Sequence, residues 1–129
     1  MHRKFVAIGA ILAAVAVILG AFGAHGLKKI VEAESIQTFQ TGVQYQLYHA
    51  LAIIITSILF DRNPSKLIQY AGWLFVTGII LFSGSLYLLV FFKAAEIMES
   101  GKPGLITPFG GLSFISGWIC IFLSYIRKK

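Results

Sequence analysis

Two histidines, His25 and His49, have the side chains of this sequence that are best suited to ligand binding or proton transfer. An imidazole can bind a metal or a haem iron, or carry a proton. His49 stands within an apolar stretch, and an ionisable residue in a membrane segment is a functional hypothesis by default. Straight helices would separate the two imidazoles by about 13 Å in depth. A metal or haem shared between them is therefore disfavoured, and we predict no cofactor.

Each histidine also has a simpler interpretation as part of the structure. His49 comes close to the middle of the bilayer, where it can hydrogen-bond across the helices to a hydroxyl such as that of Thr77 or Ser116. His25 stands among glycines at the end of an apolar segment. This position favours an interfacial residue next to close packing or a turn, with a ligand-binding loop as the alternative.

Several polar side chains are predicted to share the outer half of the membrane with His49. Gln44, Tyr45, Gln46 and Tyr48 precede it on the same segment, and Ser83 comes at a similar depth on another. Polar groups in hydrocarbon need partners, so these side chains are expected to face the bundle interior or a small wet cavity. A further residue, Thr107, is placed to cap the last apolar segment. The candidate ligand- or partner-binding residues are His49, Gln44, Tyr45, Tyr48, Ser83, His25 and Thr107.

Groups that would support catalysis or active transport do not accompany these candidates. None of the four apolar cores contains Asp, Glu, Lys or Arg, so the membrane carboxylate expected of a proton-coupled pump is missing. The sequence contains no Ser-His-acid set, paired carboxylate site, phosphate loop or metalloprotease motif. Cys120 is the single cysteine, which rules out an intramolecular disulfide and a thiolate metal cluster. We therefore predict that the protein is not an enzyme.

Four apolar segments must position the candidate residues. The chain has 129 residues, of which 57% are hydrophobic and 12% charged, whereas about 25% are charged in a typical soluble domain. Apolar runs of about 18 residues or more indicate membrane spans. The sequence therefore predicts an all-α integral membrane four-helix bundle, with a single domain over residues 1–129. Its spans are expected at approximately 5–26, 36–60, 67–92 and 108–126.

Small residues recur on three of these spans at spacings that permit close helix contact in lipid. On the first span, the expected row is Ala16, Gly20 and Ala24. The pair Gly110-Gly111 is expected to let the fourth span approach the first at Gly20, with an anion site at the free N–H groups of the fourth helix as the alternative. The phenylalanines of the third span, Phe75 among them, are expected to face lipid.

The formal net charge of +6 is better explained by membrane orientation than by nucleic acid binding, because the basic residues form short clusters between apolar segments and not one exposed face. With four spans, both termini share a side with the loop at 61–66. That side carries Arg3, Lys4, Arg62, Lys66, Arg127, Lys128 and Lys129, and the other carries Lys28, Lys29, Lys93 and Lys102. The positive-inside tendency predicts that both termini are cytoplasmic.

Four blocks of the sequence together resemble one known family. They are Gly20-Ala-Phe-Gly-Ala-His-Gly-Leu27, Phe39-Gln-Thr-Gly-Val-Gln-Tyr-Gln-Leu-Tyr-His-Ala50, Ser83-Gly-Ser-Leu-Tyr87 and Ile106-Thr-Pro-Phe-Gly-Gly111. In this order, and with four spans, they are similar to the domain-of-unknown-function 423 family of small integral membrane proteins, whose vertebrate relative is called transmembrane protein 256. The resemblance covers nearly the whole chain. It implies a four-helix membrane fold and supplies no catalytic residues.

These features lead to a functional hypothesis with one rival. We expect a multi-pass protein of the cell (inner) membrane that acts as a non-enzymatic accessory or binding protein, with a polar pocket in the outer half of the bundle. Besides the lipid bilayer, its expected partners are a membrane protein or further copies of itself, and a lipid or quinone-like ligand, with no nucleic acid. The alternative is an oligomeric conduit or facilitator for a small uncharged solute.

Overall fold

The computed structural model describes residues 2–95 and 102–127, and this part of the chain consists of helices and short connections without a strand. Helix α1 spans His2–Ala24 and α2 spans Ala33–Arg62. The third long helix has three parts, α3 (Lys66–Gly78), a π-helical turn η2 (Ile79–Ser83) and α4 (Gly84–Ala94), and the last is α5 (Thr107–Ile126). Two 3₁₀ turns, η1 (Leu27–Lys29) and η3 (Lys102–Leu105), complete the described elements.

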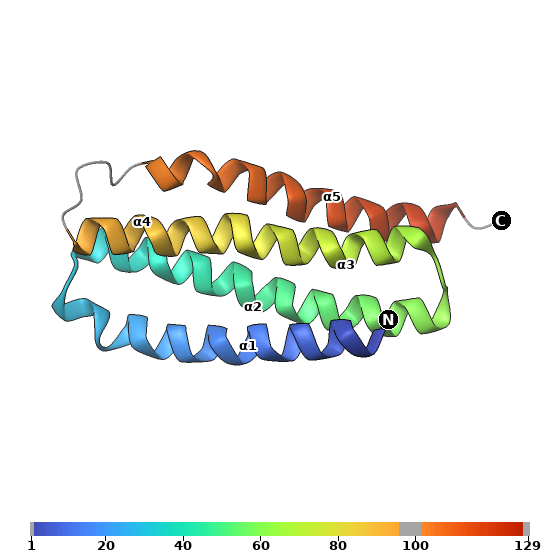
Figure 1. Ribbon diagram of the computed structural model, residues 1–129, viewed down its shortest axis with the longest axis horizontal. Helices are drawn as coiled ribbons and strands as arrows, with labels where there is room; N and C mark the ends of the chain where they lie inside the picture. The colour runs from blue at the N-terminus through green and yellow to red at the C-terminus, as the bar shows by residue number, and fades with distance from the viewer. Residues whose placement is uncertain (1, 96–101, 128–129) are drawn as a thin grey trace.

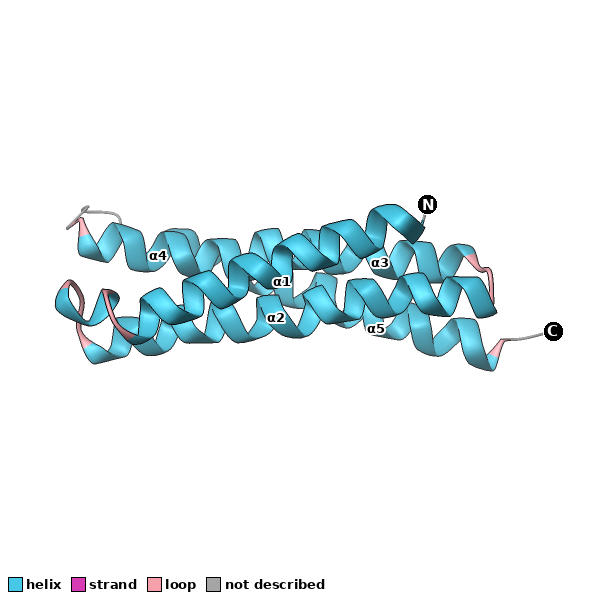
Figure 2. Ribbon diagram, turned by 90° about the horizontal axis from the view of Figure 1, so that it is seen from below, coloured by secondary structure: helices cyan, strands magenta, loops and turns pink. Residues whose placement is uncertain are grey.

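The predicted class, an all-α protein with four membrane spans, is confirmed, because four helices are long and apolar enough to cross a membrane. Figure 1 shows α1 and α5 at opposite edges of the bundle, with α2 and the α3–η2–α4 helix between them. The described ends of the chain lie at the same end of the bundle in both views (Figures 1 and 2). Lys128 and Lys129, which contributed to the predicted orientation, lie outside the described residues.

The turn between α2 and α3 is fixed by its own sequence. Pro64 disfavours a helical conformation for the residue before it, and α2 ends there. Ser65 then caps α3, because its hydroxyl accepts a hydrogen bond from the N–H of Leu67 at 3.1 Å. The carboxamide of Asn63 donates to the carbonyl of Ser124 at 3.3 Å. This bond ties the turn to the last part of α5.

Glycine allows α1 to pack closely on α2, along a row that agrees only in part with the predicted one. A β-carbon at Gly9 would lie 2.7 Å from the carbonyl oxygen of Ala50, and one at Gly23 would lie 2.9 Å from the ring of Phe39. Ala16 is buried between them, whereas Ala24 is exposed. The contact row therefore repeats every seven residues, which is the period of helices that cross at a shallow angle.

The apolar core has two parts along the bundle. At the end that holds the chain termini, buried side chains from all four spans meet: Phe5, Ala52, Ile53, Ala71, Phe75, Ile79 and Phe114. Toward the opposite end, the second group is Ala16, Leu27, Phe39, Val43 and Val90. Phe75 is fully buried, so its expected lipid-facing position is wrong. It points away from lipid because Gly117 leaves space for its ring on α5, where a β-carbon would come within 2.8 Å of Phe75 Cδ1.

The π-helical turn η2 keeps one face of the third long helix directed at α2. Phe75, Ile79, Ser83 and Tyr87 follow one another at intervals of four, and in a regular helix each interval would rotate the side chain by about 40° beyond a full turn. In η2 the N–H of Gly84 bonds to the carbonyl of Ile79, five residues earlier, which widens the turn and reduces this drift. Ser83 and Tyr87 can therefore both reach α2.

Candidate functional site

His49 lies on the buried face of α2, and both of its ring nitrogens have partners. Nδ1 is 2.9 Å from the carbonyl oxygen of Tyr45, and the indole Nε1–H of Trp118 donates to Nε2 over 3.1 Å. The expected hydroxyl partners, Thr77 and Ser116, are both exposed, so that prediction is wrong. They point outward because α3 and α5 are in close contact through other residues, among them Gly117.

The imidazole of His49 is also enclosed by aromatic rings. Phe114 stacks on it with ring centroids 3.6 Å apart and an angle of 9° between the planes. Phe75 lies 5.4 Å away on α3, and Tyr45 lies 6.2 Å away on the same helix as His49. Only 5% of His49 is exposed. Its surroundings therefore leave no room for a ligand beside the ring.

A second polar link joins three helices through Gln46. Its carboxamide N–H donates to the carbonyl of Leu12 on α1 over 2.8 Å, and its oxygen accepts from the hydroxyl of Tyr87 on α4 over 2.6 Å. The two side chains meet because each leans toward the N-terminal end of its own helix, and these helices run in opposite directions. Gly42 leaves space for the tyrosine ring, since a β-carbon there would lie 2.8 Å from Tyr87 Cε1.

Ser83 and Thr107 are also engaged inside the bundle. Ser83 is fully buried, and its hydroxyl donates to the carbonyl of Gly42 over 2.6 Å. The hydroxyl of Thr107 lies 2.5 Å from that of Ser85. Thr107 was expected to cap α5, but it is the first residue of that helix and Ile106 occupies the capping position. Thr107 thus links α5 to α4.

Two candidates on α2 do not face the interior as expected, because Gln44 is exposed and Tyr48 is 55% exposed. Tyr45 is 38% exposed, but its ring packs against that of Phe82 with centroids 4.8 Å apart. The reason is the helical period of about 100° per residue: once Gln46 and His49 face the core, Gln44 and Tyr48 must lie on the opposite side of α2.

His25 follows α1 in an exposed turn. Its backbone N–H donates to the carbonyls of Ala21 and Phe22, each at 3.2 Å. Its imidazole is therefore not brought to that of buried His49. Within residues 2–95 and 102–127, no group of three His, Cys, Asp or Glu side chains could hold a metal ion.

Sequence reasoning did not select Trp118, Tyr87 and Ser85 as candidates, although each bonds to a polar residue on another helix. Trp118 and Tyr87 were recognisable only as aromatic residues inside spans, a position that is common for lipid-facing or core side chains. Gln46 was expected to face the bundle interior, and it is buried there on the helical face that it shares with His49.

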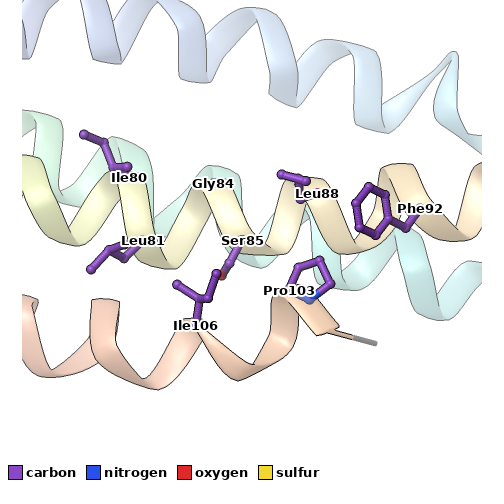
Figure 3. Close-up of a pocket in the computed structure, with 8 residues that line it drawn as sticks. All are labelled: Ile80, Leu81, Gly84, Ser85, Leu88, Phe92, Pro103 and Ile106. Atoms are coloured by element: carbon purple, nitrogen blue, oxygen red, sulfur yellow. The ribbon is translucent and has the colours of Figure 1, made fainter. Parts of the chain in front are cut away.

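An apolar groove lies between the third long helix and the start of α5 (Figure 3). Its volume is about 460 Å³, within the range of small-molecule sites. None of the seven candidate residues lines it. Its lining is Ile80, Leu81, Gly84, Ser85, Leu88, Phe92, Pro103 and Ile106. The buried side chains of His49, Gln46 and Ser83 are thus bonded within the bundle, and the groove is apolar.

Comparisons with known proteins agree with the fold. A family model described as "Protein of unknown function (DUF423)" matches residues 19–111. The UPF0382 membrane protein YwdK of Bacillus subtilis is 43% identical over 126 residues, which cover 97% of this chain and 98% of that protein. The UPF0382 inner membrane protein YgdD of Escherichia coli is 36% identical over 130 aligned residues, which cover 100% of this chain and 95% of YgdD. The search of solved structures found no significant match.

Proposed function

This chain belongs to the DUF423 (UPF0382) family of membrane proteins, and we propose that it is a non-enzymatic binding protein that holds a hydrocarbon chain in the groove between α4 and the segment Pro103 to Ile106 that precedes α5. The hydrocarbon belongs to a lipid or to the tail of a quinone-like molecule. The protein is a multi-pass protein of the cell (inner) membrane, consistent with its four apolar helices and with its inner-membrane relative. Its site is therefore open to ligands dissolved in the bilayer.

The observation that carries this proposal is the space above Gly84. A β-carbon built there meets only the carbonyl oxygen of Ile79, at 4.0 Å. Leu88 and Phe92 flank this space on α4, and Pro103 and Ile106 face it from the other side (Figure 3). An aliphatic chain in the groove would contact apolar atoms on both sides, and such packing favours association within lipid.

The engagement of the buried polar groups supports a binding role over catalysis. A general base needs a free nitrogen within hydrogen-bond reach of its substrate, and both nitrogens of His49 already have partners. The hydroxyls of Ser83 and Ser85 are directed to Gly42 and to Phe82 and Thr107, not to a histidine. A polar pocket for the ligand would require these bonds to break.

Native mass spectrometry of gently extracted protein tests the proposal. Gly84→Leu should fill the groove, because a β-carbon there has no atom closer than 4.0 Å, and it should abolish retention of the apolar molecule that accompanies the unmodified protein. Gly111→Leu is the matched control, because a β-carbon there also meets a single atom, Phe82 Cδ2 at 4.0 Å, and lies outside the groove. The mass of the retained molecule distinguishes a lipid from a quinone. Equal retention by both variants, or no retained molecule in the unmodified protein, would contradict the proposal.

The alternative function, an oligomeric conduit for a small uncharged solute, needs a polar path. Between the helices of one subunit, the side chains of Gln46, Ser83 and His49 are already bonded to other side chains or to the backbone, so such a path would run between subunits. Solute flux in proteoliposomes separates the two functions. Selective flux that is lost on Tyr45→Phe would support the conduit, and flux no faster than in empty liposomes would exclude it for the solutes tested.

A further inference from the structure

The outward face of α2 carries polar groups that have no hydrogen-bond partner among the described residues. The carboxamide of Gln44 and the hydroxyl of Tyr48 are exposed, and neither makes a hydrogen bond to any described residue. Neighbouring Thr41 differs, because its hydroxyl donates to the carbonyl of Gln37 on the same helix. Gln44 and Tyr48 therefore need partners from outside the subunit.

Lipid tails cannot supply those partners. Measured along α2 from Phe60, the last apolar residue before the charged turn, Gln44 lies at about 24 Å and Tyr48 at about 18 Å. Both positions fall within a hydrocarbon layer of about 30 Å. Polar groups at this depth normally face other protein or water. The exposure of Gln44 and Tyr48 thus indicates a surface that is covered in the membrane.

The same face has the spacing of a helix-pairing seam. Its residues alternate at intervals of three and four from Thr41 to Ile58, which is the a/d pattern of two helices that wind around each other. The inner half of the seam is aliphatic and well exposed, with Leu51 at 49%, Ile55 at 44% and Ile58 at 53%. The α2 seam is Thr41, Gln44, Tyr48, Leu51, Ile55 and Ile58.

We propose that the α2 seam binds the α2 seam of a second copy of this chain. Two copies inserted with the same orientation can pair about a two-fold axis along the membrane normal, which brings identical seam positions opposite each other. A carboxamide has both donor and acceptor atoms, so Gln44 can bond to Gln44 of the partner subunit. The hydroxyls of the two tyrosines are self-complementary in the same way.

The rest of the seam also fits a second copy. No charged residue interrupts it between Thr41 and Ile58, so self-pairing brings no like charges together. The aliphatic residues meet aliphatic residues of the partner at the same depth. A different partner helix would need polar atoms at the depth of Gln44 and apolar atoms elsewhere, a match that a second copy provides by symmetry. The seam is a different surface from the groove at Gly84, so this inference does not rest on the proposed function.

Disulfide cross-linking of the full chain in its native membrane tests the pairing, in a Cys120→Ser background that has no other cysteine. Leu51→Cys should give a covalent dimer with a membrane-permeant oxidant. The control is Ile18→Cys, which lies on α1 and is 66% exposed. It should give at least five-fold less dimer. Adding Gln44→Leu to Leu51→Cys should reduce the dimer at least three-fold without disturbing the subunit, because Gln44 is exposed and makes no hydrogen bond to a described residue.

Three outcomes would overturn the inference. The first is absence of a dimer from Leu51→Cys, and the second is equal cross-linking from Ile18→Cys, which would reflect random collision. The third is cross-linking that Gln44→Leu leaves unchanged, because the paired carboxamides would then not hold the interface. Capture of a protein of another mass at Leu51→Cys in place of the dimer would assign the α2 seam to a different partner.

Discussion

Trp118 on α5 donates its indole N–H to Nε2 of His49 on α2, over 3.1 Å. An indole nitrogen can only donate and a carbonyl oxygen can only accept, so the bond from Nδ1 to Tyr45 requires the proton on Nδ1. The two bonds together fix the neutral form of His49 with a single tautomer. The imidazole therefore joins α2 to α5 as a structural group.

Trp118→Phe should lower the free energy of unfolding by about 1 kcal/mol, because Nε2 of buried His49 loses its donor. Trp73→Phe is the matched control for loss of ring size, since Trp73 is similarly exposed (42% against 46%) and makes no hydrogen bond to a described residue. Unfolding in detergent with increasing SDS measures both variants. An equal effect of the two substitutions would show that the hydrogen bond contributes nothing.

The link between Gln46 and Tyr87 should appear as a coupling in a double-mutant cycle. Gln46→Leu leaves the partly buried hydroxyl of Tyr87 without its acceptor, so the double variant with Tyr87→Phe should be more stable than the sum of the single effects predicts. The expected coupling is about 1 kcal/mol. Tyr125→Phe serves as a control for loss of a tyrosine hydroxyl, because Tyr125 is 43% exposed and has no described hydrogen bond. Additive effects would mean that the 2.6 Å contact has no energetic role.

Two adjacent glycines on α5 should respond very differently to alanine. A β-carbon at Gly110 would lie 2.7 Å from the α-carbon of Phe82. One at Gly111 would lie 4.0 Å from its nearest neighbour, Cδ2 of the Phe82 ring. A clash with backbone cannot be relieved by a side-chain rotation, so Gly110→Ala should cost about 3 kcal/mol. Gly111→Ala should change stability by less than about 1 kcal/mol. Similar stability of both variants would argue against the close contact of α5 with η2.

The orientation predicted from the basic residues can be tested with a matched pair of exposed lysines at opposite ends of the bundle. In a Cys120→Ser background, Lys28→Cys should react with an impermeant maleimide added to intact cells. Lys66→Cys should react only after the membrane is permeabilised, because the positive-inside tendency puts its turn in the cytoplasm. The opposite labelling pattern would place both termini outside.

Much of the fold could be predicted because it depends on local composition. Four long apolar segments are enough to require helices in a membrane, where every backbone polar group must be bonded within its own segment. Contacts between helices were less predictable. The pair Gly110-Gly111 was expected to meet Gly20, but Gly110 packs on Phe82, and Gly20 faces Val43 of α2. A row of small residues shows that a close contact is possible, but it does not identify the partner.

The candidate site was likewise predictable only in part. The sequence by itself determined that polar side chains, His49 among them, would lie in membrane spans, because composition and length fix the spans. Only the tertiary structure decided that His49 and Gln46 face the core while Gln44 and Tyr48 face outward. That choice depends on how α2 is rotated, and its rotation is set by packing against α1, α3 and α4. Because hydrogen-bond partners such as Trp118 are 69 residues away in the sequence, no local pattern could have identified them.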